Sequence, residues 1–302
     1  MKKLLYHPTI NKVLRTIAKP LSPVIPGSFK FPVTGIIKVK VPGGNHILVQ
    51  CNPTSFVARK LFWEGMDGFE FTMARLFTEL AKRAGVFLDV GSNIGYYSLL
   101  AAAVNPELKI TSFEPAPAVF KYLQINRNLN QFSHITVEQL ALSDEEGELT
   151  FFISKNPKYL DIAEHHLTST GSFDKAQADR TTVLESVKVG TITMDQYVAR
   201  HDVSTIDLIK LDTEATEHLV LAGAQHVLAD HKPFIFCEVL RGKVEKEIES
   251  AFKKHNYLFF RLEKDRVIRV DSLSDDRAKT NDHLMVHPDK LSIVEPLLNT
   301  VV

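Results

Sequence analysis

Residues 86–98 of this 302-residue chain read VFLDVGSNIGYYS: a short apolar run, a turn of small residues and the beginning of a helical pattern. Gly91 and Gly95 allow the backbone of the turn to approach another group closely. The first N–H groups of the following helix have no partner inside the helix, so they suit an anionic group of a ligand. The stretch therefore predicts a buried strand, a ligand-binding turn and a helix.

Apolar runs and helical patterns alternate along much of the chain after this stretch. The runs that we expect to form core strands are residues 86–90, 110–114, 135–138, 206–212 and 234–239. Repeated strand–helix units build a parallel sheet with helices on both faces. The last apolar runs have no helices between them and predict an antiparallel edge: residues 257–262, 267–270 and 283–287. The expected fold class is therefore α/β, with a doubly wound, mostly parallel sheet and an antiparallel C-terminal edge.

Residues 1–68 are expected to form an N-terminal extension outside this sheet. Four prolines divide the first 30 residues into a short helix and a turn-rich arm. Residues 36–41 and 46–50 are strand-like and flank the sequence PGGN, which is typical of a β-hairpin. The extension therefore combines a helix, an arm and a hairpin.

Residues 69–302 are expected to form the main domain. Its entry helix is predicted over residues 69–84, where apolar residues have helical spacing, and Gly85 is expected to stop it. Residues 143–198 are a polar insertion between the two series of core strands. The insertion contains two strand candidates, residues 148–153 and 187–194. So polar a segment inside a sheet-building chain predicts a substrate loop.

The N-terminal extension is basic, although the formal net charge of the chain is zero. Ten Lys and Arg residues and no Asp or Glu precede Glu64, so the rest of the chain has ten more acidic than basic residues. We expect the arm to lie against an acidic face of its own protein or of a second subunit. Docking on an anionic membrane surface or a phosphorylated acceptor is the alternative.

Composition restricts the setting of the protein. Cys51 and Cys237 are too few for a disulfide scaffold and lack the C-x-x-C spacing of zinc or redox sites, so we expect a cytoplasmic location. No window approaches the ~18 apolar residues of a membrane span. Polar residues and Pro8 interrupt the apolar run that a signal peptide needs.

Glu114 ends the core strand that follows Gly91, where an acidic side chain commonly accepts hydrogen bonds from ribose hydroxyls. Gly91 and Glu114 together predict a cofactor that contains adenosine. The chain lacks the G-x-G-x-x-G pattern that a pyrophosphate requires, which disfavours NAD. S-adenosylmethionine has no phosphate, so it fits this turn better.

Five motifs in this order resemble the FkbM-type methyltransferase family: DVGSNIGYYS at residues 89–98, FEP at 113–115, NRNLN at 126–130, ALSD at 141–144 and KLDTE at 210–214. The similarity spans residues 87–239. It implies a class I methyltransferase fold, S-adenosylmethionine as cofactor, and O-methylation of a sugar, polyketide or related hydroxyl. It also implies that Ala141 and Leu142 border the adenine.

The expected site falls into two groups of residues. Those expected to bind the cofactor are Asp89, Gly91, Ser92, Asn93, Gly95, Tyr96, Glu114, Pro115, Ala141 and Leu142. Those expected to position the acceptor and remove its proton are Lys210, Asp212 and Glu214, because a hydroxyl is a poor nucleophile while it is protonated. A structural ion-pair cluster is the alternative reading of this second group. Asp212 and Glu238 lack a third metal ligand, so we expect no metal.

The family pattern has glycine where this chain has Ala215. Alanine disfavours positive φ, so we expect either ordinary helical geometry or a shifted loop there. His165 and His166 in the polar insertion are further candidates for a base. Of Tyr96 and Tyr97, one is expected to face the core.

Three functions remain open: a methyltransferase, a cofactor-binding partner module without catalysis, and an NAD-type dehydrogenase. We expect the first, with a small-molecule or glycan acceptor and no nucleic-acid partner. Phe62, Trp63 and Phe69 either cap the pocket or, as we expect, anchor the entry helix in the core.

Overall fold

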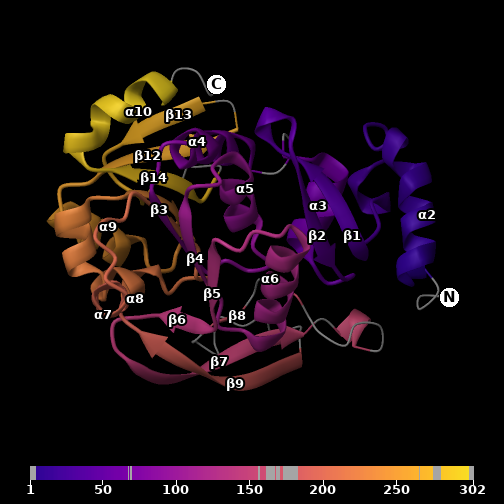
Figure 1. Ribbon diagram of the computed structural model, residues 1–302, viewed down its shortest axis with the longest axis horizontal. Coiled ribbons are helices and arrows are strands. Elements are labelled where there is room, and N and C mark those ends of the chain that lie inside the picture. Colours follow the sequence, from indigo (N-terminus) through magenta and orange to yellow (C-terminus); the bar gives the residue numbers. More distant parts are fainter. Residues whose placement is uncertain are drawn as a thin grey trace.

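The computed structural model describes residues 5–66, 68, 70–155, 157–160, 167, 171–172, 183–264, 266–274 and 280–298. Its centre is an eight-stranded sheet in the order β13-β12-β14-β11-β10-β3-β4-β5 (Figure 1). The parallel strands are β3 (Val86–Val90), β4 (Lys109–Phe113), β5 (Ile135–Glu138), β10 (Leu208–Leu211) and β11 (Phe234–Glu238). The antiparallel edge consists of β12 (Leu258–Glu263), β13 (Arg266–Val270) and β14 (Asp282–Val286). The expected fold class is therefore confirmed.

Helices cover both faces of the sheet. Adjacent residues of β3 show this, because Phe87 packs into one apolar core and Leu88 into the other. The first core includes side chains of α4 (Phe71–Ala81), α5 (Tyr96–Val104), α6 (Pro117–Leu129) and α10 (Leu291–Leu298). The second includes side chains of α7 (Met194–Arg200), α8 (Glu217–Ala222), α9 (Glu245–Lys254) and the short π-helix Val227–His231. The sheet is thus doubly wound.

The polar insertion forms a second sheet together with the short strand that precedes it. Its four strands follow the order β6-β9-β7-β8, with β6 (Leu140–Leu142), β7 (Gly147–Lys155), β8 (Gly171–Ser172) and β9 (Val183–Ile192). The prediction that residues 187–194 continue as a strand is wrong at its end. Thr193 caps α7 by accepting a hydrogen bond from the Gln196 N–H, so the helix begins at Met194. The pairing of β6 with β9 was not predicted.

The entry helix is shorter than predicted. It ends at Ala81, and Gly85 does not stop it. The Gly85 N–H instead donates to the Asp207 carboxylate at 2.8 Å, which aligns the starts of β3 and β10. The spacing of apolar residues favoured a helix as far as residue 84. The hydrogen bond between Gly85 and Asp207 instead directs the backbone into β3.

The predicted hairpin is present as β1 (Gly35–Lys40) and β2 (His46–Cys51), joined by the 3₁₀ turn Pro42–Gly44. Asn126 in α6 and Asn130 at the C-terminal end of this helix attach the hairpin to the main domain. The side-chain oxygens of Asn126 and Asn130 accept from the backbone N–H groups of Gln50 at 2.7 Å and Leu48 at 2.8 Å. The edge of β2 that does not pair with β1 is therefore covered by side-chain partners rather than left open.

The N-terminal arm folds back on its own protein, but it contacts β1 rather than the acidic face that was expected. It contains α2 (Pro8–Ala18) and the 3₁₀ helices Lys19–Leu21 and Gly27–Phe29, and it lies beyond β1 in Figure 1. The guanidinium of Arg15 donates to the carbonyls of Thr34, at 2.8 Å, and Ile36. Among the described residues, its basic side chains form no ion pair with an acid, so backbone carbonyls replace the acidic surface that the charge distribution suggested.

Lys19 of the arm donates to the carbonyls of Phe62 and Trp63 in α3 (Phe56–Glu64). The remaining 3₁₀ turns are Pro157–Tyr159 and Pro288–Lys290. Over the described ranges, no helix has both the length and the apolar character that crossing a bilayer requires.

Arg15→Met should lower the free energy of unfolding by about 2 kcal/mol, because two carbonyls at the edge of β1 lose a charged donor. Thermal unfolding of the purified variant measures this loss. Lys12→Met is the matched control, since Lys12 lies on the exposed side of the same helix. Equal melting temperatures for the two variants would contradict the bracing role of Arg15.

Candidate functional site

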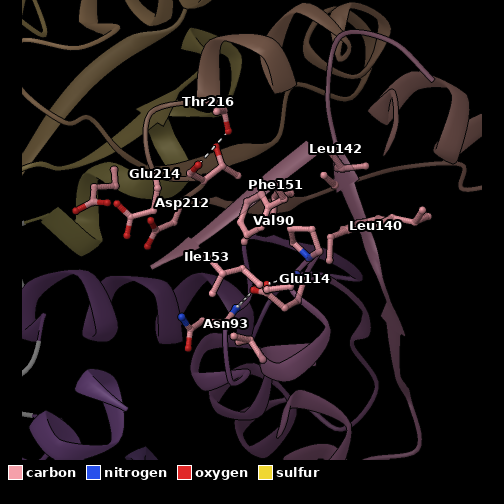
Figure 2. Close-up of a pocket in the computed structure, with 18 of the residues that line it drawn as sticks. Val90, Asn93, Glu114, Leu140, Leu142, Phe151, Ile153, Asp212, Glu214 and Thr216 are labelled. Atoms are coloured by element: carbon pink, nitrogen blue, oxygen red, sulfur yellow. Dashed lines mark hydrogen bonds between the residues drawn. The ribbon is translucent and has the colours of Figure 1, made fainter. Parts of the chain in front are cut away.

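A cavity lies at the carboxyl ends of β3, β4, β10 and β11, on the side where open α/β sheets bind ligands (Figure 2). Its polar lining comes from the strand ends and the loops that follow them. Its apolar lining includes Phe56 and Val57 of α3, and Phe151 and Ile153 of β7. The second sheet and the N-terminal extension therefore both help to enclose the site.

The turn after β3 touches the loop after β10. Gly91 has a φ of 78°, and a Cβ atom placed on it would lie 1.8 Å from the carbonyl oxygen of Asp212. The N–H groups of Gly91 and Ser92 both donate to the carbonyl of Phe113, at 3.1 and 3.0 Å. Only glycine fits this position. The sequence suggested that Gly91 makes room for a cofactor, whereas the contact with Asp212 already requires it.

Glu114 lies buried at the end of β4, facing the cavity. One carboxylate oxygen accepts from the Asn93 N–H at 3.0 Å and the other from the Ala116 N–H at 2.9 Å (Figure 2). Burial raises the pKa of Glu114 to about 7, although both backbone donors lower it. Each oxygen keeps a lone pair for a ligand hydroxyl. The side chain is thus held rigidly for bidentate acceptance.

Asp89 has a different environment from the one expected. Its carboxylate accepts from the N–H of Ser98 at 3.1 Å and from the Ser98 hydroxyl, which also contacts Ser112. Burial raises the pKa of Asp89 to about 6. Asp89 therefore satisfies a donor in the first turn of α5, so the expectation that these donors await an anionic ligand does not hold for Ser98. Gly95 does not line the cavity and packs against Leu123 instead.

Lys210 lines a small pocket that adjoins the cavity, together with Tyr96 and Tyr97. It is 2% exposed, and its ammonium donates to Asp212 at 3.1 Å. Burial alone lowers the pKa of Lys210, but the carboxyl groups around it outweigh that effect and raise the pKa above its ordinary value. The carboxyl groups are those of Asp212, Glu70, Asp282 and Glu238. Lys210 therefore keeps its proton.

Asp212 forms an acidic group with Glu214 and Glu238, and all three line the cavity. Burial, followed by the nearby Asp212, raises the pKa of Glu214 to about 8 and that of Glu238 to about 9. Glu238 also shares a hydrogen bond with Asp212. At neutral pH these two neighbours are mostly protonated, while Asp212 faces the Lys210 ammonium. Over the described part of the chain, no three His, Cys, Asp or Glu side chains are arranged to hold a metal ion.

The loop at residues 213–217 has the positive φ angles that favour glycine, although it contains no glycine. Ala215 has a φ of 73° and Glu214 a φ of 57°, so of the two alternatives expected there, ordinary helical geometry is wrong. Glu217 holds the loop from inside: one carboxylate oxygen accepts from the N–H of Thr213 at 2.8 Å, its hydroxyl at 3.1 Å, and the N–H of Ala215 at 3.3 Å. These bonds offset the cost of left-handed backbone, about 1–2 kcal/mol per residue.

The opposite end of the cavity is apolar. Ala141 and Leu142 of β6 line it next to Pro115, and the side chains of Phe113 and Leu140 extend the same surface. A flat aromatic group of a ligand would be enclosed there without a buried charge. In Figure 2, Phe151 lies between this end and Asp212, and Glu114 lies below them, near Asn93.

Most of the predicted site residues meet around this cavity and its adjoining pocket. Gly91, Asn93, Glu114, Pro115, Ala141, Leu142, Asp212 and Glu214 line the cavity, whereas Asp89, Ser92, Tyr96 and Lys210 line the adjoining pocket. Both Tyr96 and Tyr97 are buried in the core. His165, His166 and Phe69 lie outside the described residues, and Phe62 and Trp63 pack together away from the cavity.

Sequence reasoning missed several residues around this site, among them Phe56 and Val57 of α3. Glu70, with a φ of 49°, precedes α4 and accepts a hydrogen bond from the Tyr97 hydroxyl. Asp282 lies opposite Glu238 because β14 pairs with β11. Phe151 and Ile153 come from the inserted sheet. None of them belongs to a local motif, and only the alternating pattern of β7 gave a signal for the last two.

Comparison with known proteins yields one family. The Methyltransferase FkbM domain matches residues 89–259, more than half of the chain. The 31-O-demethyl-FK506 methyltransferase FkbM of Streptomyces tacrolimicus is 28% identical over 46% of this chain and 59% of its own length. Hexuronic acid methyltransferase AglP of Haloferax volcanii is 26% identical over 61% of this chain and 68% of its own length. The 2-O-methyltransferase NoeI of Sinorhizobium fredii is 25% identical over 53% of this chain and 65% of its own length. The chain thus spans about six-tenths of these relatives.

Solved structures show a more distant likeness. The crystal structure of methyltransferase FkbM from Methylobacillus flagellatus KT is 14% identical, with a TM-score of 0.43. The match covers 68% of this chain and 44% of that one.

Gly91→Ala should destabilise the protein by about 3 kcal/mol, because the new methyl group collides with the Asp212 carbonyl and alanine must adopt left-handed backbone. Chemical unfolding measures the change. Gly27→Ala is the control, since no atom lies within 4 Å of the position that its Cβ would take and its φ is not positive. If both variants unfolded at the same denaturant concentration, the proposed contact between the two loops would be wrong.

Proposed function

Because this chain belongs to the FkbM methyltransferase family, we propose that its cavity binds S-adenosylmethionine beside an acceptor hydroxyl that becomes methylated. One observation carries the proposal: Glu114 and Asp212 face the same cavity from the ends of β4 and β10. The first carboxyl group suits a ribose diol, and the second suits the removal of a proton.

The lining of the cavity fits an adenosine group. Glu114 is held by two backbone donors and has free lone pairs for two hydroxyls. The apolar surface formed by Ala141, Leu142 and Phe113 suits an adenine ring. When bound, S-adenosylmethionine supplies an electrophilic methyl group. Asn93, Gly91 and Pro115 complete the binding surface in this proposal.

Asp212 is the proposed proton acceptor. Lys210 retains its proton and donates to Asp212, which fixes the orientation of the carboxylate and stabilises its negative charge. Glu214 and Glu238 have pKa values raised to about 8 and about 9, so they serve as neutral hydrogen-bond partners near neutral pH. We therefore assign acceptor orientation to Glu214 and no base role to Lys210.

The acceptor class rests on relatives. A hexuronic acid methyltransferase and a 2-O-methyltransferase are among them, as is a methyltransferase of demethylated FK506. We propose a hydroxyl of a sugar or of another natural product as the acceptor. The acidic lining contributed by Glu70, Asp212 and Glu238 supports a polyhydroxylated acceptor, because such a molecule offers many donors.

Isothermal titration with S-adenosylmethionine, S-adenosylhomocysteine and NAD⁺ tests the cofactor assignment. We expect binding of the first two and none of the third. Release of S-adenosylhomocysteine in the presence of uronic acids, oligosaccharides and hydroxylated macrolides then identifies the acceptor. Tight NAD⁺ binding without S-adenosylmethionine binding would overturn the proposal.

Cofactor affinity should depend on pH through Glu114. The ionised carboxylate accepts both ribose hydroxyls, and its pKa is about 7 in the free protein. Affinity should therefore be constant well above pH 7 and fall as pH decreases through 7, by about tenfold per unit in the limit. Titrations between about pH 5.5 and about pH 8.5, a range that brackets that pKa, measure this profile. Glu114→Gln should bind more weakly at high pH and lose the dependence; an unchanged profile in this variant would exclude Glu114.

Asp212→Asn should lower turnover by roughly 10² to 10⁴ while changing cofactor affinity far less, because the amide cannot accept the hydroxyl proton. Steady-state kinetics and cofactor titration of the same preparation separate the two effects. Asp271→Asn is the control, since Asp271 is exposed and does not line the cavity. Full turnover in the Asp212 variant would shift the base role to another residue.

A further inference from the structure

Helix α2 presents its polar side to the protein and its apolar side outward. Asn11 and Arg15, one turn apart, are its buried residues. Asn11 accepts from the Thr34 N–H at 3.0 Å and donates to the Pro32 carbonyl at 3.1 Å. A surface helix of a globular protein ordinarily buries its apolar stripe instead. The helix is therefore inverted with respect to the core.

The outward side carries a continuous apolar stripe. Ile10, Val13, Leu14 and Ile17 follow helical spacing on α2, and Leu21 and Val24 are exposed in the segment after it. Ile17 is 66% exposed, Leu21 54% and Val24 77%. Phe29, at the end of the next 3₁₀ turn, is 73% exposed. We call the exposed side chains of Val13, Leu14, Ile17, Leu21, Val24 and Phe29 the arm face.

The arm face is concentrated in one part of the chain. Of the eleven large hydrophobic residues that are exposed among the described residues, six belong to it. Single exposed apolar residues are ordinary on protein surfaces, but a cluster indicates an interaction site. The polar contacts of Asn11 and Arg15 hold the helix in this orientation, so the face is presented by a braced element.

The charged residues of the arm itself are all basic. No Asp or Glu occurs before Glu64, whereas Lys12 lies on α2 and Lys30 follows Phe29. An isologous dimer through this face would bring the basic residues of two arms into one interface without acidic partners from either arm, which like-charge repulsion disfavours. An anionic surface, by contrast, complements them. Basic residues beside an apolar helix face are typical of interfacial membrane helices.

We propose that the arm face docks the protein on a membrane surface of anionic phospholipids. The apolar side chains enter the boundary between headgroups and acyl chains, and Lys12 and Lys30 contact the headgroups. The helix lies in the plane of the interface. This attachment is peripheral and reversible, and it does not depend on the proposed catalytic chemistry.

The arm is also connected to the cavity. Arg15 and Lys19 lie over the ring of Phe62 in α3, and Phe56 and Val57 of the same helix line the cavity. Docking through the arm face would therefore fix the orientation of the cavity with respect to the bilayer.

Cosedimentation of the full chain with vesicles tests the proposal. Vesicles of phosphatidylcholine that contain phosphatidylserine should bind the protein at low salt and more weakly at ~0.15 M salt, since exposed charges are screened. Vesicles of phosphatidylcholine alone should bind it at least about tenfold more weakly. Absence of binding to the anionic vesicles at either salt concentration would overturn the proposal.

Two pairs of variants separate the apolar from the electrostatic contribution. Ile17→Asn with Leu21→Asn removes apolar surface without changing the charge and should reduce binding at least about tenfold, whereas Ile293→Asn, at a 42% exposed position of α10, should not change it. Lys12→Glu with Lys30→Glu should reduce binding by about tenfold or more, whereas Lys243→Glu with Lys246→Glu, which has the same charge change at another surface, should have little effect.

Unchanged thermal unfolding must accompany each loss of binding. Equal binding by the Ile17/Leu21 variant and the Ile293 variant would exclude the arm face. Sedimentation without lipid tests for a dimer. If the wild-type chain were a dimer and the Ile17/Leu21 variant a monomer, the arm face would bind a second copy, and membrane docking would be overturned.

Discussion

The close approach of Gly91 to the carbonyl oxygen of Asp212 joins the two loops from which the candidate site is built. Parallel strands β3 and β10 bring these loops to one edge of the sheet. The absence of a side chain at Gly91 allows them to touch, since a Cβ atom would lie 1.8 Å from that oxygen. With the loops in contact, Glu114 and Asp212 face one cavity. A larger residue would separate the cofactor side from the acidic side.

The electrostatics of the site depend on one buried ammonium. Lys210 is enclosed with several carboxyl groups, which would repel one another strongly without it. Part of the excess negative charge is removed by protonation, because the pKa values of Glu214 and Glu238 are raised to about 8 and about 9. The arrangement leaves Asp212 as the carboxylate that Lys210 contacts directly. Structural pairing and the proposed base role are thus two aspects of the same contact.

The loop that carries Glu214 shows how a motif tolerates a substitution. The family glycine position is Ala215, yet its φ of 73° remains in the left-handed region. Three hydrogen bonds to one oxygen of Glu217 hold the loop there. Residue propensity alone favoured another backbone conformation, and a side chain four residues after Thr213 overrides it. Local rules fail at this position because a buried acceptor offsets the strain.

Periodicity and motif order by themselves determined the central sheet, its antiparallel edge and the hairpin, and they placed Gly91, Glu114 and Asp212 at strand ends. These features depend on local patterns that repeat with the period of a strand or a helix. Only the tertiary structure brought Glu70 and Asp282 to Lys210, placed β7 over the cavity and turned the apolar side of α2 outward. These features depend on pairing between distant strands and on carbonyls at an open sheet edge. Neither leaves a local pattern in the sequence, since the partners are far apart along the chain.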